Sequence, residues 1–545
     1  MKTERWGRYI LLSIPLLFFS FFFFYPLATA VIPGLHIKYL SLIVGDPYYR
    51  RIIGFTTVQA IASSILTLIL GLPGAYIISH YKFRGKALVK AVATIPFIMP
   101  SLMVAAGFLL LFGSSDFVAS VLSVIAGRQV DPGILYSWKA IILAHAFYNF
   151  PIVMRMTGSA WERMDADLVD AARTLGAGKW QIFRRVTLPY LYPSIMAASL
   201  LTFIFCFMSF AVVLILGGVR YTTIEVSIYT LSNVMFRPEM ASAMAIVQIS
   251  ISLLFMYLYL KMSGKPIKAG RPRGLKAVRG KDILSLEGVA LIIYSAVMFL
   301  LVLGPMIAVV WQSFTSRSGF FTLRFYSDIF SVKADSVIGI SPFQTIVNSL
   351  YFAVLAVIFS LLLSMLLSYA LYYGRNGKEK WLDPLFMLPM GVSAVTLGFG
   401  MIRAFISPPV QIYGSWWAIA IAHTVIVFPF VFRSVSNSVR GMNPDLTAAA
   451  RTLGASRLQS FLMVELPQIT PGMVVGAIFG FAISIGEFGA TLMLYRPQYS
   501  TIPIAIYRFL GARNFGAATA MAVILMLIAG ISFLMIERFS DQKVF

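Results

Sequence analysis

The chain has 545 residues, of which 59% are hydrophobic and only 12% are charged, and its formal net charge is +23. A composition this apolar excludes an ordinary soluble domain. The positive charge alone would fit a nucleic-acid-binding protein, but its distribution along the chain argues against that class.

Apolar stretches long enough to cross a bilayer recur along the whole chain. A bilayer core about 30 Å thick needs roughly 20 apolar residues in a helix, and backbone groups in lipid must be satisfied within each segment. We therefore expect an all-α integral membrane protein with about twelve transmembrane helices. The expected spans are residues 9–32, 52–80, 91–113, 134–157, 191–217, 240–262, 287–311, 346–373, 383–406, 414–436, 469–495 and 515–537. We expect the first span to be retained, because it is too long for a signal peptide and lacks a clear cleavage site.

Lysine and arginine cluster in segments that this span order places on one side of the membrane. The densest cluster runs from Lys261 to Lys281, without an acidic residue between its basic residues. The positive-inside rule then predicts a multi-pass protein of the plasma or inner membrane with both termini cytoplasmic. The expected counter-charge is the anionic surface of the lipid bilayer, and no nucleic-acid partner is expected.

An internal repeat divides the chain. The segment Asp170–Gly176 returns 278 residues later as Ala448–Gly454, and the pair Leu188-Pro189 returns as Leu466-Pro467. Earlier in the chain the offset becomes 293, so that Pro96 corresponds to Pro389. We predict a first six-span repeat at 1–262, a basic cytoplasmic linker at 263–285 and a second repeat at 286–545. Six spans separate the copies, so the repeats are expected to be parallel, with a pseudo-two-fold axis along the membrane normal.

A polar segment between the fourth and fifth spans of each repeat, at about 159–189 and 437–467, has a strong local pattern. Asp165 or Asp167 is a candidate N-cap, and Gly176 can end a helix in the left-handed conformation. A second short helix should follow, and Leu188-Pro189 should begin span five. The pattern predicts two short helices at an angle, with small residues exposed for docking by another protein.

These two segments resemble the cytoplasmic EAA loop of the membrane subunits of binding-protein-dependent ABC importers. That loop reads Glu-Ala-Ala, then a glycine four residues later, and ends in Leu-Pro. Asp170 and Ala448 replace the usual glutamate. The resemblance implies the type I importer permease fold and coupling helices that dock on two copies of an ABC ATPase. The matching positions are Asp170, Ala171, Ala172, Gly176, Leu188, Pro189, Ala448, Ala449, Ala450, Gly454, Leu466 and Pro467.

The resemblance also implies an extracytoplasmic solute-binding protein as a partner. The chain contains no Gly-x-x-x-x-Gly-Lys-Ser/Thr motif. ATP and Mg are therefore expected in the separate ATPase, and this chain is expected to be a transporter subunit without its own cofactor, not an enzyme.

Candidate residues for a translocation path or gate lie on spans five and eleven. Glu487 aligns with Ser209, and a carboxylate at that depth costs about 2–3 kcal/mol. It is either a gate or a residue that a cationic solute senses, or else a structural acid hydrogen-bonded to a neighbouring helix. The phenylalanines fit packing better than a ligand cage, although a hydrophobic gate would look the same. The candidates are Phe203, Phe207, Ser209, Phe210, Ser484, Glu487 and Phe488.

His145 and His423 recur at equivalent positions in the two repeats, which favours structural hydrogen bonds over metal ligation. Cys206, the single cysteine, fits a small packing residue and excludes a disulfide within the chain. No metal site is expected.

The solute is less determined than the class. The fusion of two permease copies, together with segments 140–151, 203–218 and 222–229, resembles thiamine permeases, whereas segments 486–491 and 501–507 are also similar to fused ferric-iron permeases. We favour a thiamine-like solute over ferric iron, followed by phosphonate. An ion-gradient-driven secondary transporter also has two parallel six-span halves, but it predicts intramembrane proton relays and no patterned loops. A membrane enzyme would need convergent catalytic groups, which the isolated His145, His423 and Glu487 do not form.

Overall fold

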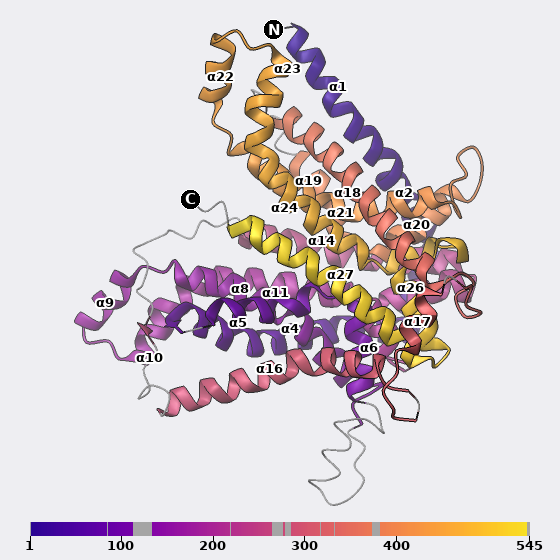
Figure 1. The fold of residues 1–545 in the computed structure, drawn as a ribbon, viewed down its shortest axis with the longest axis horizontal. Coiled ribbons are helices and arrows are strands. Elements are labelled where there is room, and N and C mark those ends of the chain that lie inside the picture. The colour runs from indigo at the N-terminus through magenta and orange to yellow at the C-terminus, as the bar shows by residue number, and fades with distance from the viewer. Residues whose placement is uncertain are drawn as a thin grey trace, which may run out of the picture. The chain divides into compact units, whose positions relative to one another are not determined.

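The computed structural model describes residues 2–83, 85–112, 133–218, 220–263, 276–277, 285–316, 318–331, 333–372 and 382–541. Within these ranges helices dominate (Figure 1), and the strands are β1 (Tyr81–Lys82) and β2 (Lys276–Ala277), which pair in parallel. The predicted all-α class is confirmed.

Contacts divide the chain into two compact units, which are described separately. Unit 1 comprises Met1–Leu40, Ile228–Ile246 and Gln312–Phe545, and unit 2 comprises Ser41–Ser227 and Val247–Trp311.

The main helices of unit 1 are α1 (Lys2–Phe19), α2 (Tyr25–Val31), α17 (Arg324–Phe330), α18 (Pro342–Tyr372), α19 (Leu382–Met387), α20 (Ala394–Phe405), α21 (Trp416–Arg440), α22 (Pro444–Thr452), α23 (Arg457–Ser460), α24 (Leu466–Ile485), α25 (Gly489–Leu494), α26 (Ile502–Gly511) and α27 (Phe515–Asp541). Those of unit 2 are α4 (Pro47–His80), α5 (Lys86–Ile98), α6 (Ser101–Leu111), α8 (Trp138–Glu162), α9 (Ala166–Thr174), α10 (Lys179–Ile182), α11 (Leu188–Phe207) and α12 (Ala211–Leu216). The helices α3 (Ile37–Gly45), α13 (Ile224–Tyr229), α14 (Pro238–Ser263) and α16 (Leu286–Ser313) run across the unit boundaries.

In the described part of the chain, nine helices are long and apolar enough to cross a membrane, and a bent pair would make a tenth. The bent pair combines residues 382–391 with α20 at an angle of 99°. The third predicted stretch of the first repeat is likewise divided, into α5 and α6. At the first interruption Met99 is extended, as residues before a proline tend to be, and Pro100 follows it. At the second, Pro389 lies in the 3₁₀ turn that precedes α20.

The fifth predicted stretch of each repeat ends earlier than expected. Helix α11 ends at Phe207 and α12 begins at Ala211, while α24 ends at Ile485 and α25 begins at Gly489. These limits differ by the repeat offset of 278 residues, so both repeats break at the same place. Ser209 and Glu487 therefore lie in helix breaks, not within continuous spans.

Helix α11 begins at Leu188 with proline in its first turn, as predicted, but it continues directly from the preceding short helix. A continuous helix runs from Lys179 to Phe207 and contains the π-helical turn Phe183–Thr187. In this turn the Leu188 N–H bonds to the Phe183 carbonyl, which accommodates the following proline without ending the helix. The second repeat has the same turn at Phe461–Glu465.

The first helix of each repeat packs within the unit formed mainly by the other repeat. In unit 1 the Phe19 ring lies 4.5 Å from the Phe428 ring, and the Thr29 hydroxyl donates to the Gly400 carbonyl at 3.1 Å. In unit 2 the Tyr294 hydroxyl of α16 donates to the Leu70 carbonyl of α4 at 2.6 Å. The packing units therefore cut across the sequence repeats, whose exact boundaries stay a prediction.

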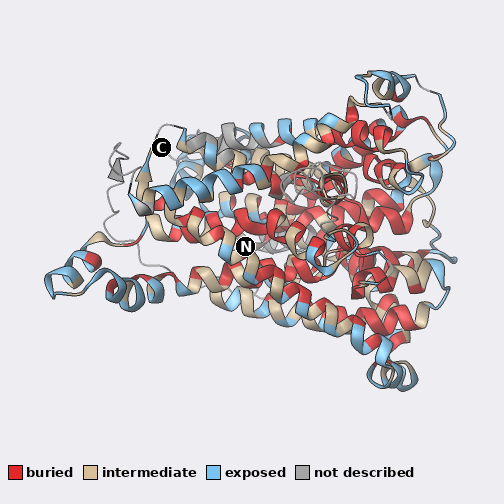
Figure 2. Ribbon diagram, turned by 90° about the horizontal axis from the view of Figure 1, so that it is seen from below, coloured by how far each residue is buried: buried red, intermediate tan, exposed pale blue. Residues whose placement is uncertain are grey.

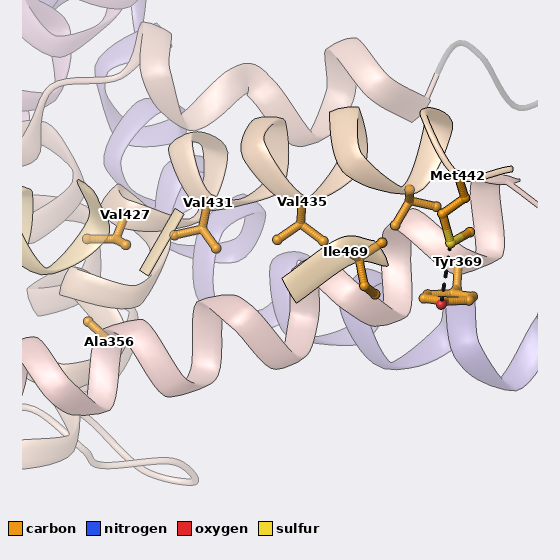
Figure 3. Close-up of a cluster of buried hydrophobic side chains, with 8 residues drawn as sticks. Ala356, Tyr369, Val427, Val431, Val435, Met442 and Ile469 are labelled. Carbon is orange, nitrogen blue, oxygen red and sulfur yellow. Dashed lines mark hydrogen bonds between the residues drawn. The ribbon is translucent and has the colours of Figure 1, made fainter. Parts of the chain in front are cut away.

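Side-chain burial follows the helix faces within each unit: buried residues cover the inner faces and exposed residues the outer ones (Figure 2). In unit 1 a row of valines on α21 packs against α18 and α24, and the Tyr369 hydroxyl donates to the Met442 sulfur at 4.0 Å (Figure 3). Val427, Val431 and Val435 follow one another every four residues, so they lie on one side of α21. This core extends to Met442 and so supports the start of the loop that carries α22.

Candidate functional site

The loop between α8 and α11 contains the two short helices that the sequence predicts. The Asp165 side chain caps α9 by accepting the Asp167 N–H at 3.1 Å. At the other end Gly176 has φ +79°, and its N–H donates to the Arg173 carbonyl at 2.9 Å. The Ala177 N–H donates to the Ala172 carbonyl at 3.0 Å. This bond pair is a Schellman motif, so the glycine predicted to end the helix does end it.

The second repeat builds the same loop from different residues. The Asn443 side chain caps α22 by accepting the Asp445 N–H at 2.9 Å. Gly454 has φ +90°, and the Ala455 N–H donates to the Ala450 carbonyl at 3.0 Å. Figure 1 shows α22 with α23 at the end of unit 1, and α9 with α10 at the end of unit 2.

A small local core holds the first loop in place. Val169 of α9 packs with Met164 and Ile182, and the partly buried Ala172 contacts the same cluster. The second alanine of the motif thus faces inward, whereas Ala171 and its counterpart Ala449 are exposed. The replaced glutamate position is exposed in both loops, and Asp170 forms an ion pair with Arg173 at 3.2 Å.

Two leucines in these loops are far more exposed than their chemistry favours. Leu175 is 87% exposed and Leu453 is 88% exposed, and each directly precedes the capping glycine. Trp180 is 70% exposed on α10. Sequence reasoning did not single out these residues, although the leucine recurs in both copies of the repeat. Leu175 and Trp180 therefore both place an apolar side chain on the outside of the first loop.

In unit 1, the buried His423 of α21 is hydrogen-bonded to side chains of α24 and α25, on either side of the helix break that contains Glu487. His423 Nδ1 is hydrogen-bonded to the Ser484 hydroxyl at 2.7 Å, and Nε2 to the Thr491 hydroxyl at 2.8 Å. The Glu487 carboxylate accepts the backbone N–H groups of Ala490 at 2.8 Å and Thr491 at 2.9 Å, together with the Thr491 hydroxyl. The acid therefore caps α25, an arrangement that stabilises negative charge at a helix start.

The first repeat arranges its equivalent histidine differently. His145 Nδ1 lies 3.3 Å from the Ser63 hydroxyl, and Asn149 donates to the Cys206 sulfur at 3.4 Å. Position 209 is a serine, so no carboxylate stands where Glu487 stands in unit 1. Cys206 is buried, as expected for a packing residue.

The aromatic candidates are packed within their own units. In unit 2 the Phe203 ring stacks on Phe255 at 3.8 Å and on Phe207 at 5.5 Å. In unit 1 the Phe488 ring lies 5.4 Å from the Tyr507 ring. Phe210 is buried in the helix break between α11 and α12. The placement of these residues along a translocation path stays a prediction.

Comparison with known proteins shows the family to which the chain belongs. The family described as "Binding-protein-dependent transport system inner membrane component" matches residues 67–263 and 372–545, once in each repeat. The protein is thus a multi-pass membrane permease subunit of a binding-protein-dependent ABC importer, and it is not itself an enzyme. The two matches cover more than half of the chain, and the chain belongs to this family.

Similar curated proteins include permeases of different systems. The thiamine transport system permease protein ThiP of Escherichia coli is 24% identical, over 92% of this chain and 90% of its own length. The probable ABC transporter permease protein y4fN of Sinorhizobium fredii is 26% identical, over 83% of this chain and 80% of its own. The putative 2-aminoethylphosphonate transport system permease protein PhnV of Salmonella paratyphi A is 30% identical, over 37% of this chain and 76% of its own.

Proposed function

We propose that this permease imports a thiamine-like solute. The support is that the similarity to ThiP extends over 92% of the chain, and so through both fused repeats. A phosphonate is the second candidate, because the similarity to PhnV is higher in identity but extends over only 37% of the chain.

The loops of α9–α10 and α22–α23 are proposed to dock on two copies of an ABC ATPase, which binds ATP and Mg. The observation that carries this proposal is the near-complete exposure of Leu175 and Leu453 at equivalent positions. Leucine leaves water favourably when a partner covers it. The glycine caps turn the chain sharply after each leucine, so the leucine lies at the tip of its helix.

The orientation follows from charge and from unit 1. In that unit the start of α1 lies at the same end as α22 and α23 (Figure 1). With the basic segments on the cytoplasmic side, both termini are proposed to be cytoplasmic. The solute-binding protein then docks on the opposite, extracytoplasmic side.

The path is proposed to follow the helix breaks after α11 and α24. Non-helical backbone at membrane depth is tolerated only where it is buried in protein or borders a water-filled cavity. Ser209 and Phe210 lie in the first break, and Glu487 and Phe488 in the second. ATP-driven closure of the ATPases would move the coupling loops, and the path would then open alternately to the cytoplasmic and the extracytoplasmic side.

Co-purification in mild detergent tests the docking proposal. The wild-type permease should retain about two ATPase chains, and Leu175→Ser with Leu453→Ser should lose them while still inserting into the membrane. Phe320→Ser is the matched control, because Phe320 is 73% exposed and lies outside both loops. Equal ATPase retention by the double variant would overturn the docking assignment.

Uptake into proteoliposomes that contain the whole complex and its binding protein tests the solute. Labelled thiamine should accumulate with ATP, whereas 2-aminoethylphosphonate and ferric iron should not. Accumulation of the phosphonate alone would replace the first proposal with the second. Flux that follows a proton or sodium gradient without ATP would contradict the class.

A further inference from the structure

Unit 2 contains an apolar cavity whose walls include neither the residues of the α9–α10 loop nor those of the helix break after α11. It has a volume of about 660 Å³, within the roughly 300–1,000 Å³ typical of ligand pockets. Its walls come from α4, α5, α8 and α16. Representative wall residues are Ile78, Val92, Ala93, Met154, Met298 and Val302.

The few polar groups of the wall do not make a site for an aqueous solute. The Tyr294 hydroxyl is already committed to the Leu70 carbonyl at 2.6 Å. Ile292 and Phe299, which also border the cavity, are 50% and 59% exposed, so the cavity opens on the surface that the bilayer covers. An empty apolar space of this size would forfeit dispersion contacts along its whole wall.

One end of the cavity meets positive charge. Tyr81, Phe83 and Ser285 border it where α4 ends and α16 begins, at the end of unit 2 that carries α9 (Figure 1). Lys82 lies between two of these residues and is exposed. In the sequence, Ser285 is the last residue of the basic linker, whose last lysine is Lys281.

Two lysines at this end share one carboxylate oxygen. Lys86 Nζ lies 3.6 Å and Lys90 Nζ 3.2 Å from the same oxygen of Glu162. Burial lowers the pKa of Lys86, and the charge of Lys90 acts in the same direction, while Glu162 opposes them. A second anion at this end would relieve the repulsion between the lysines.

We propose that this cavity holds one acyl chain of an anionic phospholipid of the cytoplasmic leaflet, with the phosphate of its headgroup at Lys82 and Lys86. An acyl chain gains little by leaving one apolar medium for another. Selectivity must therefore come from the charged headgroup, and the site distinguishes anionic from zwitterionic lipids.

Native mass spectrometry of the permease released from nanodiscs of phosphatidylglycerol and phosphatidylcholine tests this proposal. The wild-type protein should retain one phosphatidylglycerol. Ala93→Phe, which fills the cavity, should abolish retention, whereas Ala290→Phe should not, because Ala290 is exposed on α16 and does not border the cavity.

A second pair of substitutions tests the contribution of the two lysines. This test remains valid even if the Ala93→Phe variant fails to fold. Lys82→Gln with Lys86→Gln should weaken phosphatidylglycerol retention roughly 30-fold. Lys139→Gln should not, because Lys139 lies at the opposite end of α8 from Glu162.

Three outcomes would overturn the proposal. One is equal retention of both lipids, and another is no effect of the two lysine substitutions. The third is displacement of the lipid by excess glycerol phosphate, which would indicate a phosphate site that needs no acyl chain.

Discussion

The Nε2 atom of His423 lies 3.3 Å from the Oε2 atom of Glu487, and both side chains are buried. The same carboxylate caps α25 through the backbone N–H groups of Ala490 and Thr491. The first repeat has a histidine at the equivalent position but a serine in place of the acid. The repeats therefore share a scaffold and differ in the charge at the helix break.

Glu487→Gln should lower the thermal stability of the purified permease, by about 1–3 kcal/mol in the free energy of unfolding. The amide keeps one acceptor oxygen, but its NH₂ group faces the donors that now bond the second carboxylate oxygen. Thermal unfolding in detergent measures the change, and Ser209→Ala is the matched control. Normal stability with lost uptake would instead assign Glu487 a direct role in the path.

Thr56→Val should destabilise the first repeat, again by about 1–3 kcal/mol, because a buried N–H loses its acceptor. The Thr56 hydroxyl accepts the Ile224 N–H at 3.0 Å, and Ser349 accepts the Ile502 N–H at 2.8 Å. These pairs are related by the offsets of 293 and 278 residues read from the sequence.

The control for this pair of sites is the conservative exchange Thr56→Ser, which keeps the hydroxyl and should unfold near the wild-type temperature. Ser349→Ala should cost about as much as Thr56→Val. If Thr56→Ser and Thr56→Val unfold alike, the hydroxyl bond does not stabilise the repeat.

Gly400→Ala should destabilise unit 1 by about 1–3 kcal/mol, the usual cost of overpacking. An added Cβ would lie 2.4 Å from the Pro26 carbonyl oxygen of α2. Gly54→Ala is the control, since a Cβ there meets nothing within 4 Å. Size-exclusion chromatography after heating measures both, and equal survival would contradict the packing of α2 against α20.

Gly176→Val should impair transport more than it impairs insertion, because φ +79° disfavours a β-branched residue at the end of α9. Gly176→Asn should retain more activity, since asparagine tolerates this conformation. ATPase binding and uptake, measured at equal membrane levels, check the order. The valine and asparagine variants of Gly454 should rank in the same order. If valine and asparagine have equal effects at both glycines, the glycine cap does not determine the shape of the loop.

Local chemistry determined much of this protein from sequence alone. Apolar length predicted the membrane class, and the glycine caps and N-caps of α9 and α22 were predictable because their hydrogen bonds join residues within about five positions of each other. The 293-residue offset also relates Thr56 to Ser349, although nothing in the sequence indicated that these two hydroxyls have equivalent hydrogen bonds. Leu175 and Leu453 were visible as repeated letters, but their exposure was not.

Only the tertiary structure decided which helices are neighbours. It packed the first helix of each repeat within the unit formed mainly by the other repeat, divided spans five and eleven at Ser209 and Glu487, and gave Glu487 its partners on α21 and α25. The physical reason is that helices in lipid are apolar on every side, so their sequences carry little periodicity to show which face meets which neighbour.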